Sequence, residues 1–147
     1  WSCLVGSEMC IRDRFKIYSG GTDTHLMLVD LRPFGVKGNI ASESLCRANI
    51  TCNKNGIPFD TEKPMITSGI RLGSQAATTR GFGLKEFEKV GELITKVIKG
   101  LSKNPEDNSQ IEEEVRKEVI DLCSSFPIYK NLNRWFVQYV RKVRPQL

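Results

Sequence analysis

The stretch from Thr67 to Gly73 reads Thr-Ser-Gly-Ile-Arg-Leu-Gly and places one arginine on a short extended segment between two helical regions. Small neighbours let a ligand approach the backbone closely, and a planar guanidinium can grip a carboxylate with two parallel hydrogen bonds. Arg71 is therefore the candidate for a functional charge. The alternative is a strand arginine in a surface salt bridge, which composition alone favours because arginines are mostly exposed.

Further extended segments surround this stretch. Apolar alternation and β-branched or aromatic content predict strands at 15–18 and 25–31. They also predict an extended segment at 49–52 and one bent strand from Met65 to Ala76 that contains Arg71. Turn residues predict an irregular connection over 53–58. Pro58 and Pro64 then bracket residues 59–63, which cannot form a regular helix.

Helical periodicity marks three other segments. The expected helices are a short one capped by Asn39, an amphipathic one over 84–101, and one over 109–126 that Pro127 stops. Ser109 and Glu112 stand three residues apart, the spacing of a capping box at the head of the last helix. These elements predict an α/β fold, with a small, mainly antiparallel sheet and helices packed on one of its faces.

The composition fits one domain of ordinary size, with 147 residues, 39% hydrophobic and 27% charged side chains. The sequence has no run of about eighteen apolar residues, which predicts a cytoplasmic protein with no membrane partner. The net charge of +5 comes from five basic residues near the end, namely Lys130, Arg134, Arg141, Lys142 and Arg144. The body of the chain is neutral, so we expect no nucleic-acid partner.

The cysteine and histidine content argues against a metal site. Five cysteines occur without a Cys-x-x-Cys pair, and His25 is the single histidine. A structural zinc site needs four such ligands at characteristic spacings. We therefore expect no metal and interpret the cysteines as reduced thiols.

The two ends of the chain differ from its body. Residues 1–14 lack helical or strand periodicity and resemble the translation of a transposon-end adapter used in sequencing libraries, so we exclude them from the fold. A natural flexible N-terminus is the alternative, and the adapter interpretation makes the chain a fragment cut upstream of Phe15. The basic tail at 133–147 is expected to lie outside the domain, with a basic amphipathic helix that touches lipid or a partner as the alternative.

Several motifs occur in an order and spacing that matches one enzyme family. They are Ser19-Gly20-Gly21-Thr22-Asp23-Thr24-His25-Leu26, Arg47-Ala48-Asn49-Ile50-Thr51, Asn53-Lys54-Asn55 followed by Pro58, Thr67-Ser68-Gly69-Ile70-Arg71, Thr79-Arg80-Gly81-Phe82, and the terminal Phe126-Pro127-Ile128-Tyr129. Through them, residues 15–132 resemble the C-terminal small domain of serine hydroxymethyltransferase, also called glycine hydroxymethyltransferase.

The resemblance implies fold-type I pyridoxal 5'-phosphate chemistry, in which a hydroxymethyl unit moves between serine and tetrahydrofolate to give glycine and 5,10-methylenetetrahydrofolate. It implies that Arg71 binds the carboxylate of the amino acid and that Asn55 contacts the pterin ring of the folate. Lys63, Pro64 and Met65 align with a folate-lining segment. Side chains in this segment vary within the family, so the resemblance carries over its backbone contacts.

The family's cofactor-bearing lysine belongs to a large domain upstream, and it has no counterpart in this chain. The resemblance therefore implies an inactive fragment whose partners are its own large domain and a second subunit, in a homodimer or homotetramer. Ser74-Gln75 stands where Thr-Pro is common, which loosens the turn after Arg71 without changing its role. The alternative is a free-standing, non-catalytic ligand-binding or interaction module, and the adapter-like start favours truncation over it.

Overall fold

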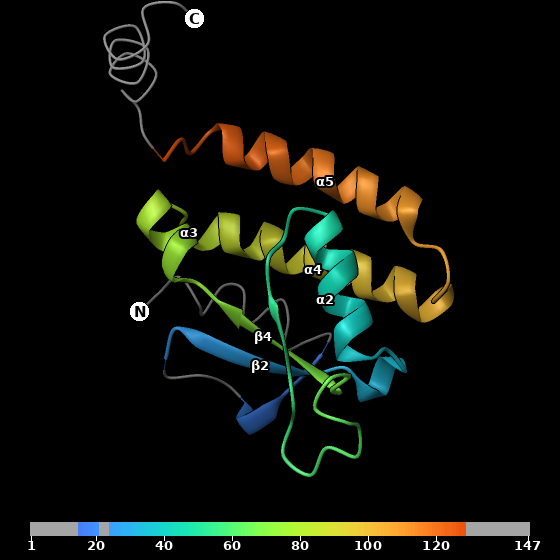
Figure 1. Ribbon diagram of the computed structural model, residues 1–147. Helices are drawn as coiled ribbons and strands as arrows, with labels where there is room; N and C mark the ends of the chain where they lie inside the picture. Colours follow the sequence, from blue (N-terminus) through green and yellow to red (C-terminus); the bar gives the residue numbers. More distant parts are fainter. Residues whose placement is uncertain (1–14, 21–23, 129–147) are drawn as a thin grey trace, which may run out of the picture.

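The computed structural model describes residues 15–20 and 24–128, so the predictions for 1–14 and 133–147 lie outside the described residues. Within them, a four-stranded antiparallel sheet lies beneath several helices (Figure 1). The strands are β1 (Lys16–Ile17), β2 (Leu26–Asp30), β3 (Asn53–Asn55) and β4 (Gly69–Gly73). The helices are α2 (Gly38–Arg47), α3 (Gln75–Arg80), α4 (Leu84–Lys103) and α5 (Ser109–Ser124), with 3-10 turns η1 (Tyr18–Gly20) and η2 (Arg32–Phe34).

Strand β4 lies in the interior of the sheet, whose order is β1-β2-β4-β3. It pairs antiparallel with β2 on one edge and with β3 on the other. Successive side chains of a strand point to opposite faces, so Ile70 and Leu72 are buried while Arg71 is exposed on the other face. The strand predicted around Arg71 is thereby confirmed in its central part.

The helices cover one face of the sheet, as predicted, and Figure 1 shows α5 farthest from the strands. Helix α2 contacts β3 and β4, and α4 packs against both α2 and α5. One apolar cluster joins buried strand residues to the α4 stripe, namely Ile17, Met27, Val29, Ile70 and Leu72 with Leu93, Ile94, Val97, Ile98 and Leu101. Each such side chain contributes roughly 1.5–3 kcal/mol when fully buried, so this layer is the main source of stability.

Several predicted boundaries are wrong. Met65 lies in a turn before β4, where the N–H groups of Ile66 and Thr67 donate to the carbonyl oxygen of Lys63 at 2.8 and 3.0 Å. At the other end of the predicted strand, helix α3 already begins at Gln75. The extended segment at 15–18 shortens to Lys16–Ile17.

Strand β3 was misplaced by the sequence interpretation, which expected the extended segment at 49–52 and a turn at Asn53. Asn49 has φ of 63°, a left-handed conformation that turns the chain after α2, and the strand begins at Asn53. Its three residues, Asn53–Asn55, are polar or charged and lie at the sheet edge. A strand of this kind carries no apolar alternation, so periodicity does not reveal it.

The start of α2 also differs from expectation, because Lys37 is the N-cap residue and Asn39 lies inside the first turn. The N–H groups of Gly38 and Asn39 donate to the carbonyl oxygens of Thr67 and Ile66, both at 2.9 Å. Backbone carbonyl oxygens thus accept the hydrogen bonds from these N–H groups, in place of a side-chain cap. Glycine is required at position 38, since a Cβ there would lie 2.5 Å from the backbone carbonyl oxygen of Gly69.

The capping box predicted for Ser109 and Glu112 is absent, and Asn108 is the N-cap of α5. Glu112 is only 6% exposed, and its carboxylate accepts hydrogen bonds from Arg47 Nε (2.6 Å), Arg47 Nη2 (2.7 Å) and Ser44 Oγ (2.6 Å). Bidentate bonds to a guanidinium are stronger than one bond to a backbone amide, so the side chain turns to α2. These bonds from Arg47, opposed by burial, lower the pKa of Glu112.

We predict that Glu112→Gln lowers the free energy of unfolding by about 2 kcal/mol, because hydrogen bonds to charged groups are lost at a buried site. Urea denaturation followed by circular dichroism measures the change. Glu113→Gln is the matched control, since its side chain is 56% exposed and its pairs with Arg116 and Lys117 are 3.8 and 3.9 Å long. We expect less than about 0.5 kcal/mol there, and equal losses in both variants would contradict the assignment.

The same pair predicts a pH dependence. The folded-state pKa of Glu112 lies below its ordinary value of 4.5, so the folded chain binds fewer protons than the unfolded chain in the window between the two values. The stabilisation is fully present above pH 4.5 and is lost as pH falls through the folded-state pKa. The stability gap between the parent and Glu112→Gln should therefore narrow on acidification below pH 4.5, in urea titrations repeated at several pH values. A gap that does not change with pH would overturn this account.

Candidate substrate-binding site

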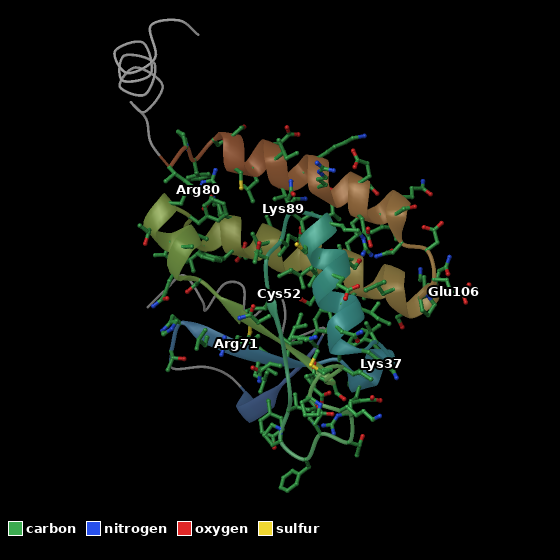
Figure 2. All side chains as sticks on the ribbon, viewed as in Figure 1. Lys37, Cys52, Arg71, Arg80, Lys89 and Glu106 are labelled. Atoms are coloured by element: carbon green, nitrogen blue, oxygen red, sulfur yellow. The ribbon has the colours of Figure 1, made fainter. Side chains whose placement is uncertain are left out.

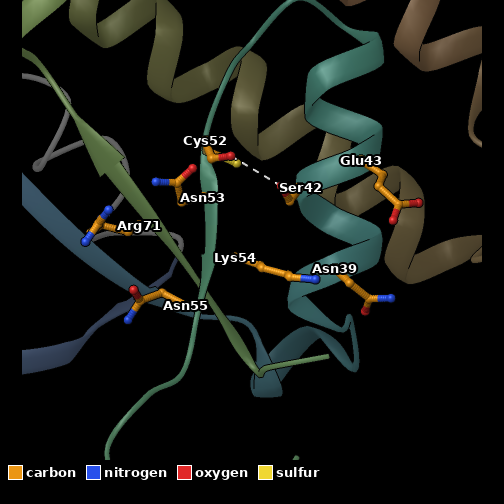
Figure 3. A pocket seen from close by; sticks show the side chains of 8 residues that line it. All are labelled: Asn39, Ser42, Glu43, Cys52, Asn53, Lys54, Asn55 and Arg71. Carbon is orange, nitrogen blue, oxygen red and sulfur yellow. Dashed lines mark hydrogen bonds between the residues drawn. The ribbon is translucent and has the colours of Figure 1, made fainter. Parts of the chain in front are cut away.

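Strands β4 and β3 place three polar side chains on the open face of the sheet. Arg71 pairs with Asn53 across the two strands, and Asn55 pairs with Gly69 two residues further along the register. Because residues two apart on a strand share a face, Arg71, Asn53 and Asn55 all lie opposite the helices. Figure 3 shows these three side chains on one side of β3, with Lys54 on the other.

A polar groove of about 390 Å³ follows the edge strand β3 and the neighbouring turns of α2. Its lining residues are Asn39, Ser42, Glu43, Cys52, Asn53, Lys54, Asn55 and Arg71 (Figure 3). Burial raises the pKa of the Cys52 thiol to about 11, so this thiol stays protonated at neutral pH and is no nucleophile. Amides, a hydroxyl and a guanidinium thus equip the groove for binding rather than for covalent attack.

Arg71 differs from the other arginines at described positions, each of which contacts a carboxylate or a backbone carbonyl oxygen. Arg32 pairs with Asp30 at 2.8 Å, Arg47 with Glu112 at 2.6 Å, Arg80 with the carbonyl oxygen of Cys123 at 2.9 Å, and Arg116 with Glu113 at 3.8 Å. Within residues 15–20 and 24–128, no carboxylate lies within ion-pair distance of Arg71. The surface salt bridge that composition favours is not found there. Arg71 lines the groove, and Figure 2 labels its side chain.

The residues expected to bind folate fall into two places. Asn55 lines the groove, and its Nδ2 donates to the carbonyl oxygen of Gly56 at 2.8 Å, which leaves its Oδ1 available as an acceptor. Lys63, Pro64 and Met65 lie in the turn before β4 and do not line the groove. Lys54 connects the two places, because its Nζ donates to the carbonyl oxygen of Met65 at 2.8 Å.

Sequence reasoning missed two residues that organise this region. Lys54 belongs to the motif Asn53-Lys54-Asn55, but nothing in the sequence indicates its hydrogen bond to Met65. Asp60 accepts hydrogen bonds from Ile57, Glu62 and Ser68, and so closes the loop between β3 and β4. An aspartate two residues after Pro58 is typical of turns, and that was the only available hint.

Other classes of site receive no support from the described residues. Within them, no group of three or more histidine, cysteine, aspartate or glutamate side chains is placed to hold a metal ion. The helices in this part of the chain also lack the length and apolar content needed to cross a membrane. The fold and the site together define a small α/β domain with a cationic, amide-rich groove at the edge of its open sheet face.

A sequence profile of the serine hydroxymethyltransferase family matches residues 4–94, and the chain belongs to this family. It is similar to the serine hydroxymethyltransferase of Pelagibacter ubique (strain HTCC1062), with 84% identity over 126 residues, which are 86% of this chain and 29% of that protein. It is 61% identical to the corresponding proteins of Marinomonas sp. (strain MWYL1) and Paramagnetospirillum magneticum (strain ATCC 700264 / AMB-1), over 84% of this chain and 29% of each. The chain thus spans under a third of the length of these relatives.

Proposed function

We propose that this chain is the C-terminal part of a serine hydroxymethyltransferase that interconverts serine and tetrahydrofolate with glycine and 5,10-methylenetetrahydrofolate. The observation that carries the proposal is Arg71, an arginine without a carboxylate partner in the described residues, placed on the open face of the sheet and within the stretch that the family profile matches. The names and identities of the relatives support the same reaction.

In this proposal Arg71 binds the carboxylate of serine or glycine. A guanidinium presents two parallel N–H donors that match the two oxygens of a carboxylate. Strand β4 is paired on both edges, so the backbone that carries Arg71 is held from two sides. A fixed backbone positions the substrate without a large loss of entropy on binding.

Asn55 and the segment 63–65 form the folate end of the proposed site. An amide both donates and accepts hydrogen bonds, which suits the mixed donor and acceptor edge of a pterin ring. Asn55 lies on the same sheet face as Arg71, two residues further along the register. Amino acid and folate would therefore meet over β3 and β4, as transfer of a one-carbon unit between them requires.

Pyridoxal 5'-phosphate supplies an electron sink for this chemistry when it is bound. The side chains around Arg71 fit the amino acid and folate, and they do not fit the cofactor. Lys54, the lysine lining the groove, already donates its amine to Met65. We place the cofactor, and the fold-type I large domain that holds it, in the part of the relatives' length that this chain does not span.

Two consequences follow for the chain on its own and for its assembly. The 147-residue chain is inactive alone, because the proposed site contains only the amino-acid and folate groups. The open sheet face bears Arg71 and the 39%-exposed Leu26, and it would face the large domain or the second subunit of a homodimer or homotetramer. We propose a cytoplasmic location for the assembled enzyme.

The protein for testing is a full-length enzyme in which residues 15–128 of this chain replace the matching stretch of the Pelagibacter ubique relative. It is assayed with pyridoxal 5'-phosphate, serine and tetrahydrofolate, and the 147-residue chain is assayed in parallel. Activity of the chimaera alone is the expected result. An inactive, folded chimaera would contradict the proposed function and favour a non-catalytic binding module.

We predict that Arg71→Ala in this chimaera raises KM for serine about 100-fold, because two charge-assisted hydrogen bonds are lost. Arg71→Lys keeps the positive charge but loses the two parallel N–H donors, so it should give an intermediate KM for serine. Arg116→Ala, at an exposed arginine paired only at 3.8 Å, is the control and should leave KM unchanged. An unchanged serine dependence in Arg71→Ala would refute the carboxylate role.

Asn55→Ala should raise KM for tetrahydrofolate about tenfold, because one hydrogen bond to the pterin corresponds to roughly 0.5–1.5 kcal/mol. KM for serine should stay within about twofold of the parent value, since Arg71 is untouched. Asn104→Ala, at the end of α4, serves as the matched asparagine control. Equal increases in both KM values would count against the role of Asn55.

A further inference from the structure

One carboxylate closes the loop between β3 and β4. Asp60 Oδ2 accepts the N–H groups of Ile57 (3.3 Å) and Ser68 (2.9 Å), and Oδ1 accepts the N–H of Glu62 (3.0 Å) and the hydroxyl of Ser68 (2.6 Å). An ionised carboxylate has about four acceptor positions, so its capacity is fully used. The hydrogen bond from the Ser68 hydroxyl is the main reason why the pKa of Asp60 falls to about 2.

The donors to Asp60 come from three different parts of the loop. Ile57 lies two residues after the end of β3, and Ser68 lies immediately before β4. Glu62 directly precedes Lys63. The segment 63–65, which the proposed function assigns to folate, therefore runs between two donors that share one acceptor group.

The loop backbone would not keep this shape unaided. Phe59 and Thr67 have φ of 59° and 61°, in the left-handed region that bulky and β-branched residues rarely adopt. Such conformations persist when surrounding interactions over-determine them. Asp60 lies next to Phe59, and its partner Ser68 lies next to Thr67, so its hydrogen bonds hold the backbone at both unusual residues.

Two further contacts hold the loop: the N–H groups of Gly38 and Asn39 bind its end at Thr67 and Ile66, and Lys54 binds the segment 63–65 more weakly than Asp60 does. Lys54 Nζ donates to the carbonyl oxygen of Met65, but this bond is exposed and depends on a long side chain. Ordering such a side chain costs conformational entropy, and water competes for both groups. The single bond from Lys54 therefore restrains the segment less than the four hydrogen bonds that Asp60 accepts.

Arg71 does not depend on Asp60 in the same way. Strand β4 has ladder partners on both edges, and Leu28 and Asn53 flank Arg71 in the register. Ile70 and Leu72 anchor the strand in the apolar cluster. Loss of the Asp60 hydrogen bonds should release residues 61–65, whereas the carbonyl groups of Ile66 and Thr67 stay bonded to Asn39 and Gly38 and β4 stays in place.

We propose that Asp60 is a positioning residue for tetrahydrofolate, which holds the backbone of residues 63–65 in place relative to Asn55 through its bonds to Glu62 and Ser68. This inference rests on the proposed function of the groove. It predicts that folate recognition and amino-acid recognition are separable, although their residues lie within twenty positions of each other in sequence.

The test is Asp60→Asn in the full-length chimaera. An asparagine has nearly the same shape but replaces one acceptor oxygen by a donor, which faces N–H and O–H donors. We expect KM for tetrahydrofolate to rise about tenfold while KM for serine stays within about twofold. We also expect faster hydrogen exchange in residues 61–65 and unchanged exchange in β4.

Asp107→Asn is the matched control, because Asp107 also accepts the N–H and the hydroxyl of one serine, Ser109, at 3.0 and 2.7 Å. It lies in the exposed connection between α4 and α5, away from the groove. We expect no change in either KM. Ser68→Ala removes a single hydroxyl donor from Asp60, and it should raise KM for tetrahydrofolate about threefold even where Asp60→Asn does not fold.

The outcomes separate this inference from the function on which it rests. An active parent chimaera whose folate KM is unchanged in Asp60→Asn and Ser68→Ala would overturn the role of Asp60 alone. Equal increases in both KM values would overturn it too, because they would show a general structural effect. An inactive parent would overturn the proposed function and the inference together.

Discussion

The structure depends on the double role of β4, which pairs on both edges while its two faces meet opposite environments. Ile70 and Leu72 join the apolar cluster beneath the helices, and Arg71, between them, faces the groove. A shift of one residue in register would bury the guanidinium and expose two apolar side chains. The same alternation that stabilises the core therefore sets the direction of the candidate binding group.

Carboxylates fix the elements around this strand. Glu112 ties α5 to α2, Asp60 ties the loop to the start of β4, and Asp30, only 1% exposed, accepts hydrogen bonds from Arg32 at the end of β2. Each of these carboxylates accepts three or four hydrogen bonds from donors in the described residues. Arg71 has no such partner in the part of the chain that the structure describes. Its charge is therefore available to a ligand, whereas the charges of the three carboxylates are already used to hold the fold together.

Sequence reasoning identified the features that follow from local pattern. The amphipathic helix α4, the strand around Arg71 and the antiparallel sheet with helices on one face all have periodic signals. The capping roles predicted for Asn39 and Glu112 are wrong. The N–H groups at the start of α2 donate instead to carbonyl oxygens of the loop before β4, and the Glu112 carboxylate accepts hydrogen bonds from Arg47. Strand β3 was misplaced because an edge strand of polar residues has no apolar alternation.

In the candidate site, too, the residues that belong to a sequence pattern were predicted and those that depend on tertiary contacts were not. Arg71 and Asn55 were singled out from motifs, and the register of β3 and β4 places them on one face. Lys54 and Asp60 were missed because their roles depend on hydrogen bonds to the carbonyl oxygen of Met65 and to the N–H and hydroxyl of Ser68, which lie eight to eleven residues away. Such contacts depend on how the loop closes in three dimensions, which spacing alone does not determine.

The strand order has a consequence for how the domain assembles during synthesis. Strand β4 is the last strand of the described residues and an inner strand of the sheet, so β2 and β3 have no common partner until residue 73 has been made. Until then β2 presents an unpaired edge, the kind of surface that other chains can join. The helices α4 and α5, which are neighbours in sequence, can pair locally and then close over the completed sheet. The groove therefore forms only at the moment when the sheet closes, and an incomplete chain cannot display it.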